Sequence, residues 1–249
     1  MRIPRFYIPF DMDVGQSLSL PGDTAQHLSR VLRMKPGRKI LLFNGHGGEY
    51  SASVTDVQRN RVTVNIESYS DHCPESPLKL TLIQSISRSD RMDYTIQKST
   101  ELGITHIQPV FSEHGIVKLE PRRLARKQQH WQKIAISACE QSGRTLVPEI
   151  LTPQNILPVL EQQYSSDVLK LIMHTSDSTA SPFRVKDIPA ELDACVILAG
   201  PEGGLSDLEV KKAMQHDFKI IQLGPRILRT ETAAMALISI LQARAGDML

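Results

Sequence analysis

The sequence predicts an α/β protein in which a small β-rich domain, residues 1–72, precedes a parallel-sheet domain, residues 73–249. The first domain has short apolar runs separated by turns that contain Gly or Pro, typical of a small barrel. A polar stretch with two prolines, DHCPESP (Asp71–Pro77), is typical of a linker. From Lys79 onward, strands that are apolar throughout alternate with helices, which predicts a parallel sheet covered on both faces.

The elements of the first domain follow from local patterns. GDTAQHLSRVLRMKPGRK predicts a short helix that ends at the turn Lys35-Pro36-Gly37. KILLFNGHGGEYSASVTDV holds two apolar-rich runs around the Gly-rich turn Asn44–Gly48, so it predicts a hairpin. RVTVNIESY alternates apolar and polar residues, which indicates a half-buried strand.

The second domain contains predicted strands and helices in alternation, except that no helix is predicted between the third and fourth strands. The predicted strands are LKLTLIQSI, ITHIQPVF, VLKLIMH, ACVILAG and KIIQLG. Of the helices between them, one closes at Gly103 and one begins at Pro121 and ends at Gly143. LSDLEVKKAMQHD begins with the capping-box spacing of Ser206 and Glu209. The last helix begins at Thr230, whose side chain can cap it.

Composition excludes several classes of protein. The three cysteines are far apart and form no CxxC, which fits reduced thiols in a cytoplasmic protein. The eight histidines form no HxxxH pair and no cluster with carboxylates, so we expect no metal. MRIPRFYIPF lacks the apolar run of a signal peptide, and no segment is long enough to span a membrane.

The charge is nearly balanced, with 29 basic and 27 acidic residues, but it is unevenly distributed. Residues 24–48 hold five basic residues and no acidic one. A second basic run contains Lys118, Arg122, Arg123, Arg126, Lys127 and Lys133 against Glu120. Each run is either a solvated face or a surface that follows the phosphates of a nucleic acid.

Three loops are candidates for the chemistry, because ligands of open parallel sheets lie beyond the carboxyl ends of the strands. They are LAGPEGGLSD (198–207), LGPRILRTETAA (223–234) and MHTSDS (173–178). Neither GxxxxGK[ST] nor a GxGxxG fingerprint after the first strand is present, and Glu202 would repel a triphosphate. Loops lined by backbone groups and apolar walls suit a ligand with an adenine ring and little negative charge. GPEGG alone is equally a tight turn before a capped helix.

Four separated segments together resemble one known family. MRIPRFY, RMDYTIQKSTELG, GPEGGLS and LGPRILRTETAA occur in the order found in the bacterial 16S ribosomal RNA uracil-N3 methyltransferases, members of the SPOUT superfamily. The resemblance covers nearly the whole chain, except for Thr152–Lys170.

The resemblance implies a fold, a cofactor and partners. The second domain is expected to be a trefoil-knotted α/β methyltransferase domain that binds S-adenosylmethionine in a cleft formed by the knot. The first is expected to be PUA-like and to bind RNA. A homodimer is implied, with 16S ribosomal RNA as the substrate, preferably within the 30S subunit.

Under this resemblance the three loops enclose the cofactor. The expected cofactor-binding residues are His174, Thr175, Leu198, Ala199, Gly200, Pro201, Gly203, Leu223, Gly224, Ile227, Leu228 and Thr230. For His174 the alternative is a structural role at a strand end.

The expected catalytic residues are Arg229, Glu231 and Glu202. Uracil N3 loses a proton during methyl transfer, and the negative charge spreads onto the flanking carbonyl oxygens. A guanidinium at a helix N-terminus stabilises such charge, although Arg229 can instead pair with either glutamate. Either glutamate could be the base, or no base is needed. The N-terminus of the last helix would lower the pKa of Glu231 and make it a poor base.

The expected RNA-binding residues are Arg2, Arg5, Arg30, Arg33, Lys98 and Arg226. Arg30 and Arg33 share a helix face, and clustered arginines beside a small barrel suit a shaped RNA. Lys98 and Arg226 contact RNA phosphate or support the dimer, and Lys98 is alternatively a plain surface residue.

Two other functions remain open at this point. The first is 2′-O-methylation of a ribose by the same fold, and the second is a ribosome-assembly factor that binds RNA without chemistry. Composition and periodicity alone support only an α/β enzyme joined to a small β domain.

Overall fold

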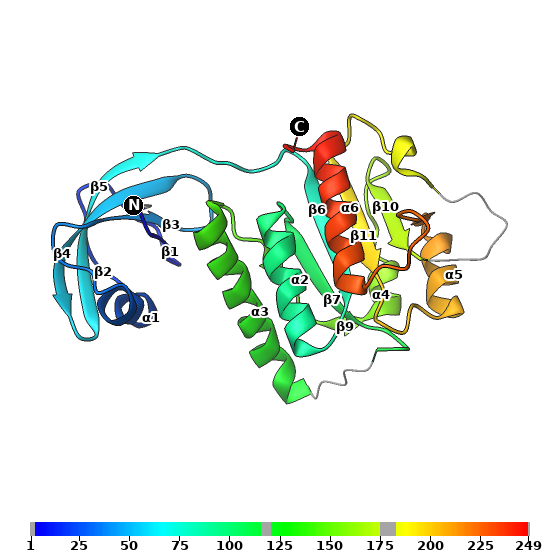
Figure 1. Ribbon diagram of the computed structural model, residues 1–249, viewed down its shortest axis with the longest axis horizontal. Helices are drawn as coiled ribbons and strands as arrows, with labels where there is room; N and C mark the ends of the chain where they lie inside the picture. Colours follow the sequence, from blue (N-terminus) through cyan, green and yellow to red (C-terminus); the bar gives the residue numbers. More distant parts are fainter. Residues whose placement is uncertain (1–2, 116–120, 175–182, 249) are drawn as a thin grey trace. The chain divides into compact units, whose positions relative to one another are not determined.

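The computed structural model describes residues 3–115, 121–174 and 183–248 (Figure 1). The chain divides into two compact units. The first comprises Met1–Glu75 and Cys139–Val147, and the second comprises Ser76–Ala138 and Pro148–Leu249.

The first unit is built on a five-stranded sheet in the order β1-β3-β4-β5-β2. Its strands are β1 (Arg5–Tyr7), β2 (Ser17–Ser19), β3 (Lys39–Phe43), β4 (Glu49–Gln58) and β5 (Arg61–Ser70). Strand β1 runs parallel to β3, and the other neighbours are antiparallel. The inward residues of β5, Val62, Val64 and Ile66, are fully buried, which confirms the alternation predicted for that strand.

The predicted hairpin around the Gly-rich turn is confirmed as β3 and β4. Gly45, Gly47 and Gly48 all have positive φ, between 70° and 94°. Glycine is the residue that adopts this conformation without steric cost. At Gly48 a side chain would also collide with the ring of Tyr69. The turn therefore depends on glycine at this position for two separate reasons.

The predicted short helix is present but is not uniform. Helix α1 (Gly22–Gln26) continues directly into a single π-helical turn, His27–Val31. Arg33 then takes a left-handed conformation with φ 48°, which breaks the helix, and Gly37 turns the chain toward β3. Leu28 is completely buried, whereas Val31 and Leu32 are exposed.

The stretch predicted as a linker is anchored at its end by hydrogen bonds within the first unit. The Glu75 carboxylate accepts from Arg144 Nε at 2.8 Å and from the backbone N–H groups of Thr145 and Leu146 at 2.9 and 3.0 Å. The Arg144 side chain is 7% exposed and that of Glu75 10%. Because both charges are buried, they stabilise the unit only as a pair.

The second unit is built on a seven-stranded sheet with the path β12-β10-β11-β6-β7-β8 and β9 paired with β7. Its strands are β6 (Lys79–Ser85), β7 (His106–Phe111), β8 (Glu149–Ile150), β9 (Gln154–Asn155), β10 (Leu169–Met173), β11 (Ala194–Ala199) and β12 (Lys219–Ile221). All neighbours are parallel. The predicted parallel sheet is confirmed.

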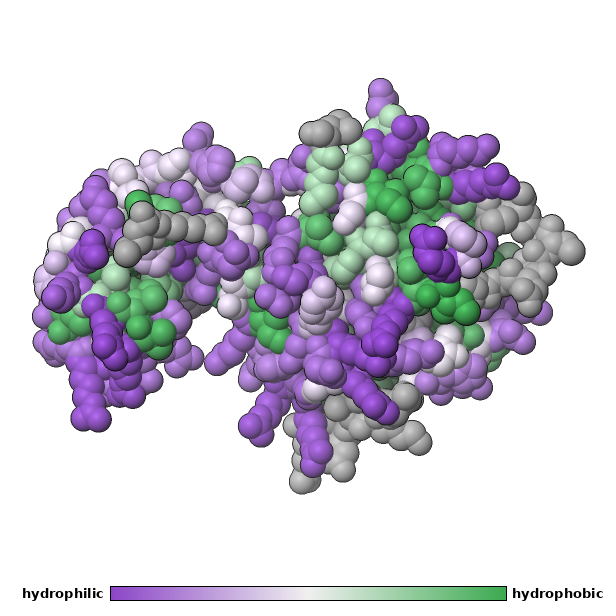
Figure 2. Space-filling view, in the orientation of Figure 1, coloured by the Kyte–Doolittle hydropathy of each residue, from purple (hydrophilic) through white to green (hydrophobic). Residues whose placement is uncertain are grey.

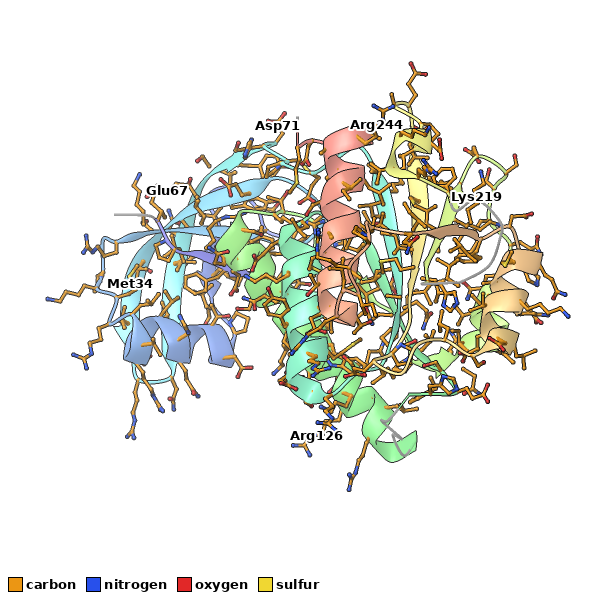
Figure 3. All side chains as sticks on the ribbon, turned by 45° about the vertical axis from the view of Figure 1, so that its right-hand side comes forward. Met34, Glu67, Asp71, Arg126, Lys219 and Arg244 are labelled. Atoms are coloured by element: carbon orange, nitrogen blue, oxygen red, sulfur yellow. The ribbon has the colours of Figure 1, made fainter. Side chains whose placement is uncertain are left out.

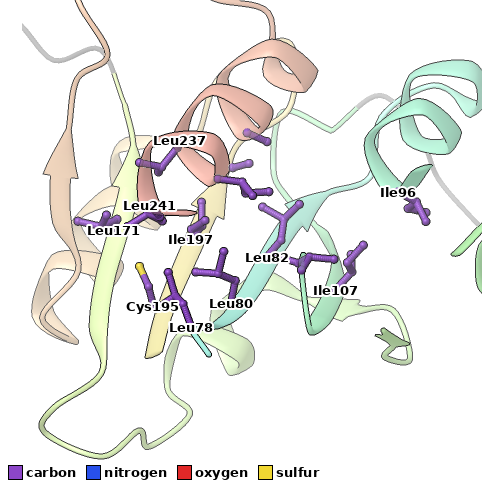
Figure 4. Close-up of a cluster of buried hydrophobic side chains, with 14 of the residues drawn as sticks. Leu78, Leu80, Leu82, Ile96, Ile107, Leu171, Cys195, Ile197, Leu237 and Leu241 are labelled. Atoms are coloured by element: carbon purple, nitrogen blue, oxygen red, sulfur yellow. The ribbon is translucent and has the colours of Figure 1, made fainter. Parts of the chain in front are cut away.

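Helices cover both faces of this sheet (Figure 1). They are α2 (Ser89–Glu101), α3 (Pro121–Ser142), α4 (Ile156–Leu160), α5 (Asp207–Gln215) and α6 (Thr230–Ala245). In β11, Cys195 and Ile197 face a core shared with α2, α3 and α6 (Figure 4). Val196 and Leu198 face the core shared with α4 and α5. Burial on both faces explains why the strands are apolar throughout.

The predicted ends of three helices are confirmed. Gly103 (φ 89°) follows α2, and Gly143 (φ 98°) follows α3. At the start of α5, Ser206 N–H donates to the Glu209 carboxylate at 2.8 Å, and Glu209 N–H donates to Ser206 Oγ at 3.4 Å. This reciprocal pair is the capping box that the spacing predicted.

None of the described helices combines the length and the apolar character needed to cross a bilayer. Within the same described ranges, histidine, cysteine and carboxylate side chains form no group of three that could hold a metal ion.

Candidate functional site

A cavity of about 490 Å³ lies where β10, β11 and β12 end and α6 begins. It has the size of a small-molecule pocket. The cavity is lined by Arg91, Met173, His174, Ala199, Gly200, Pro201, Glu202, Gly203, Gly204, Leu205, Ile221, Gln222, Leu223, Gly224, Arg226, Ile227, Leu228, Arg229, Thr230 and Ala233. Residues from all three predicted loops therefore meet at one edge of the sheet, as expected for a parallel α/β fold.

The loop after β11 is shaped by close packing around its glycines. A Cβ at Gly200 would lie 3.0 Å from Leu205 Cγ, and one at Gly203 would lie 3.2 Å from His114 Cβ. Gly204 has φ 77°, which a larger residue rarely adopts. The glycines thus let backbone groups form the cavity wall, and they bring the turn after β7 against this loop.

The loop after β12 leads directly into α6. Gly224 has φ 80°, and the Ile227 side chain that follows is 89% exposed. The sequence predicted that Thr230 caps α6, and this is wrong. The N-cap is Arg229, and Thr230, as the first helical residue, donates its hydroxyl hydrogen to the backbone oxygen of Gly200. Thr230 therefore ties the start of α6 to the glycine loop.

A buried glutamate fixes the position of a fourth loop beside the cavity. Glu209 is 2% exposed, and its Oε1 accepts from the backbone N–H of Glu113 at 2.8 Å. Its other oxygen accepts from Ser206 N–H. One carboxylate therefore holds the turn after β7 to the start of α5, and this contact keeps His114 beside Gly203.

An ion pair that the sequence did not predict stands at the cavity wall. Arg91 Nη1 of α2 lies 3.0 Å from Glu202 Oε1 of the glycine loop. The two side chains are 31% and 20% exposed. Arg91 lies within the segment RMDYTIQKSTELG, which was recognised from the sequence as a family motif. The ion pair of Arg91 with Glu202 was not predicted.

The structure places most of the predicted cofactor-binding residues around the cavity. Those that line it are His174, Ala199, Gly200, Pro201, Gly203, Leu223, Gly224, Ile227, Leu228 and Thr230. Leu198 is completely buried between the sheet and α4 and α5, and it does not line the cavity. Thr175 lies outside the described residues.

Six further residues line the cavity without having been predicted. They are Met173, Gly204, Leu205, Ile221, Gln222 and Ala233. Each lies within three positions of a predicted residue, so the loops themselves were the available signal. Sequence spacing located the loops but did not show which of their residues face inward.

The three candidate catalytic residues are placed differently. Arg229 and Glu202 line the cavity, and Glu231 does not. Arg229 makes no ion pair with any described residue, whereas Glu202 is paired with Arg91. The Oε2 of Glu231 is buried without a hydrogen-bond partner among the described residues. This geometry leaves Arg229 at the start of α6, together with Arg226 of the preceding loop, as cations available to a ligand.

The predicted RNA contacts are scattered over the described parts of both units. Arg226 lines the cavity, and Lys98 Nζ pairs with Glu101 on α2 at 2.8 Å. Arg30 and Arg33 are exposed, and Arg30 Nη2 donates to Asn60 Oδ1 at 3.0 Å. Arg2 lies outside the described residues.

The Arg5 side chain is held by contacts with other residues of the first unit. Its side chain is 6% exposed and lies 3.1 Å from Glu49 Oε2. It also donates to the backbone oxygens of Cys139 and Arg144. These contacts occupy the guanidinium, so Arg5 is poorly placed to bind an RNA phosphate.

Family comparisons match both parts of the chain. A model of the RNA methyltransferase domain matches residues 74–242. A model of the RNA methyltransferase PUA domain matches residues 20–67.

Whole-chain relatives carry one recurrent name. A protein of Buchnera aphidicola subsp. Schizaphis graminum named ribosomal RNA small subunit methyltransferase E is 36% identical over 99% of this chain and 98% of its own length. The protein of the same name from Bacillus subtilis is 29% identical over 90% of this chain and 88% of its own.

Two solved structures have nearly the same fold. The ribosomal RNA small subunit methyltransferase E of Neisseria gonorrhoeae, bound to S-adenosylmethionine, is 44% identical, with a TM-score of 0.93 and full coverage of both chains. A methyltransferase of Legionella pneumophila, also with bound S-adenosylmethionine, is 40% identical with the same TM-score over 99% of this chain and 100% of its own.

Proposed function

The chain belongs to the family of ribosomal RNA small subunit methyltransferase E, and we propose that it methylates N3 of one uridine of 16S ribosomal RNA with S-adenosylmethionine. The observation that carries this proposal is the single cavity to which all three predicted loops contribute.

The cavity fits the proposed cofactor in shape and polarity. Backbone groups of Ala199–Pro201 and Leu223–Leu228 can meet an adenine and a ribose, and Leu205 and Ile221 supply apolar walls. The Glu202 carboxylate, paired with Arg91 at the cavity wall, does not oppose a ligand whose sulfonium and ammonium groups outnumber its one carboxylate. When bound, S-adenosylmethionine supplies an activated methyl group from its sulfonium.

Arg229 is proposed to stabilise the charge that develops on the target base. The N3 proton leaves before or during methyl transfer, and the negative charge that it leaves on the base spreads to the uracil carbonyl oxygens until the new carbon–nitrogen bond neutralises it. Arg229 stands at the N-terminus of α6, where its guanidinium and the positive end of the helix act in the same direction.

The two glutamates are proposed to have supporting roles. Glu231 does not line the cavity, so it is poorly placed to accept the N3 proton. Glu202 is held by Arg91, so its role is to position the glycine loop and that arginine. We therefore propose that the N3 proton passes to solvent water and that Arg229 stabilises the anion that remains.

The molecular context of the reaction is part of the same proposal. We propose a knotted second unit and a cytoplasmic homodimer that acts on the 30S subunit. The outward face of α6 supports a dimer, because Figure 2 shows mainly pale and green surface there. Its exposed and half-exposed positions carry the small residues Thr232, Ala236, Ser239 and Ala243. Small residues let another chain approach closely, and apolar surface favours its burial.

The test is to identify the methylated nucleoside. The purified protein is incubated with methyl-labelled S-adenosylmethionine and 30S subunits from cells that lack the gene, and the RNA is digested to nucleosides. We expect label in 3-methyluridine. Label in a 2′-O-methyl nucleoside would show that a ribose oxygen, not uracil N3, is the methylated atom. Absence of label from a protein that binds the cofactor would indicate that the substrate is another RNA or that the protein is a factor without methyltransferase activity.

A further inference from the structure

The second basic run of the sequence forms one side of a helix in the second unit. Arg123, Arg126, Lys127 and His130 are spaced i, i+3, i+4 and i+7 along α3, so they share a face. Arg123, Arg126 and His130 are exposed. Figure 3 shows Arg126 projecting outward near the start of α3.

This face of α3 lies against the N-terminal half of α2. Lys127 Nζ donates to Ser89 Oγ at 2.7 Å, and His130 Nε2 lies 2.9 Å from Asp93 Oδ2. The two contacts advance together along both helices, so α2 and α3 run in the same direction (Figure 1). Arg123 is one turn before Lys127, so it lies beside the residues that precede α2, where Arg88 is the exposed N-cap.

The helix pair thus gathers five cations around the N-terminal end of α2, and we call this group the α2–α3 basic ridge. Its members are Arg88, Arg91, Arg123, Arg126 and Lys127. Arg91 lies on the side of α2 that faces away from Ser89 and Asp93, toward the cavity.

Three described acids lie against these five cations: Asp93 is engaged by His130, Asp90 is exposed in the first turn of α2, and Glu202 pairs with Arg91. The ridge therefore keeps a positive excess. The N-terminus of α2 adds to it because no side chain caps that end.

The ridge leads into the cavity. Arg91 belongs to the first turns of α2 together with Arg88, and it also lines the cavity opposite Glu202. A basic face that only contacts solvent would not be expected to include a residue of the cavity wall. Four of its five cations are arginines, whose planar guanidinium binds phosphate with two parallel hydrogen bonds.

We propose that the α2–α3 basic ridge binds the phosphate backbone of the RNA segment that flanks the target nucleotide and guides that nucleotide into the cavity. This inference rests on the proposed function and adds a substrate-binding surface on the second unit. Arg91 is the member at the cavity, and Arg88 and Arg126 are the exposed outer members.

The test measures the salt dependence of RNA binding. The full-length variant Arg88→Gln/Arg126→Gln is compared with wild type for binding to naked 16S ribosomal RNA and to 30S subunits across a salt series. Each lost phosphate contact should reduce the slope of log K against log salt by about 0.7 to 0.9. Affinity for S-adenosylmethionine should be unchanged. The matched control is Lys211→Gln, which removes an exposed cation from α5.

The outcomes separate this inference from the proposed function. A smaller slope and a higher KM for 30S subunits in the double variant, with the control unchanged, would support the ridge. An unchanged slope would overturn it and indicate a solvated face. Loss of binding to 30S subunits but not to naked RNA would also overturn it, because the partner would then be a ribosomal protein. A wild-type protein that binds RNA but transfers no methyl group would contradict the proposed function alone.

Discussion

At the scale of single residues, Arg229 is the side chain on which the proposed chemistry depends most. Arg229→Ala should lower kcat by about 100-fold or more, since one preorganised charge-stabilising group typically contributes that much. Affinity for S-adenosylmethionine should change little, because the stabilised charge arises only in the transition state. The measurement is single-turnover methyl transfer beside a cofactor titration. Equal losses of kcat and cofactor affinity would contradict the transition-state role.

The three cysteines should differ sharply in reactivity. Burial raises the pKa of Cys139 to about 12 and also raises that of Cys195, whereas Cys73 is exposed. Because the thiolate is the nucleophile, an alkylating reagent near neutral pH should modify Cys73 quickly and the other two only after unfolding. Peptide mass mapping of native and denatured protein measures this. Fast labelling of Cys139 in native protein would contradict the described packing.

At the residue level, the sequence predicted which loops line the cavity. Gly200, Gly203 and Gly224 line the cavity as expected. Leu198 does not, because alternation along β11 turns it into the core beside α4 and α5. Arg91 was not predicted, because its partner Glu202 is more than a hundred residues away in the chain.

At the scale of elements, the junction between the glycine loop and α6 depends on one hydroxyl. Thr230→Val keeps the shape of the side chain but removes its hydrogen bond to Gly200, so we expect cofactor affinity to fall by about tenfold, the effect of roughly 1.4 kcal/mol. Thr230→Ser retains the hydroxyl and is the matched control. Calorimetric titration of both variants with S-adenosylmethionine measures the difference. Equal affinities of Thr230→Val and Thr230→Ser for S-adenosylmethionine would show that the hydrogen bond from Thr230 to Gly200 does not affect the cofactor site.

The end of α3 should carry a pH-dependent contribution to stability. Burial raises the pKa of Glu140 above its ordinary 4.5, although Tyr7 N–H donates to its carboxylate at 3.0 Å. The folded state therefore holds the Glu140 proton more tightly than the unfolded state. The stabilising contribution of protonated Glu140 is fully present below the pKa that Glu140 has in the unfolded state. It is lost as pH rises through the pKa that Glu140 has in the folded state.

Denaturant unfolding of wild type and Glu140→Gln at several pH values tests this sign. The free energy of unfolding of wild type, minus that of the variant, should fall as pH rises through the range just above 4.5 and then become constant. A difference that grows with pH over that range would mean that Glu140 is stabilised as the carboxylate.

Strands and helices were predictable because their patterns are local. Apolar runs, Gly103, Gly143 and the Ser206–Glu209 box predicted five strands and four helices of the second unit, but the short elements β8, β9 and α4 were missed. The anchoring of Glu75 was not predictable, because its donors are about 70 residues away and leave no local pattern. The π-helical turn at His27–Val31 was likewise missed, since its spacing differs too little from that of an α-helix.

At the scale of the whole molecule, fold class and reaction came from different sources. The change from short strands to alternating strands and helices predicted the fold class by itself. The reaction did not follow from that pattern, because many chemistries share a parallel α/β sheet. It rests on the four motifs, the family matches and the convergence of three loops on one cavity.

The central claim is that this cavity holds the cofactor, and titration with S-adenosylmethionine tests it most directly. Ala233 of α6 lines the cavity, whereas Ala190 is exposed in the segment before β11. Wild type and Ala190→Phe should bind the cofactor with equal affinity. Ala233→Phe should lose binding while keeping its thermal unfolding transition, because the ring fills the site. A folded Ala233→Phe variant that binds S-adenosylmethionine as tightly as wild type would contradict the account.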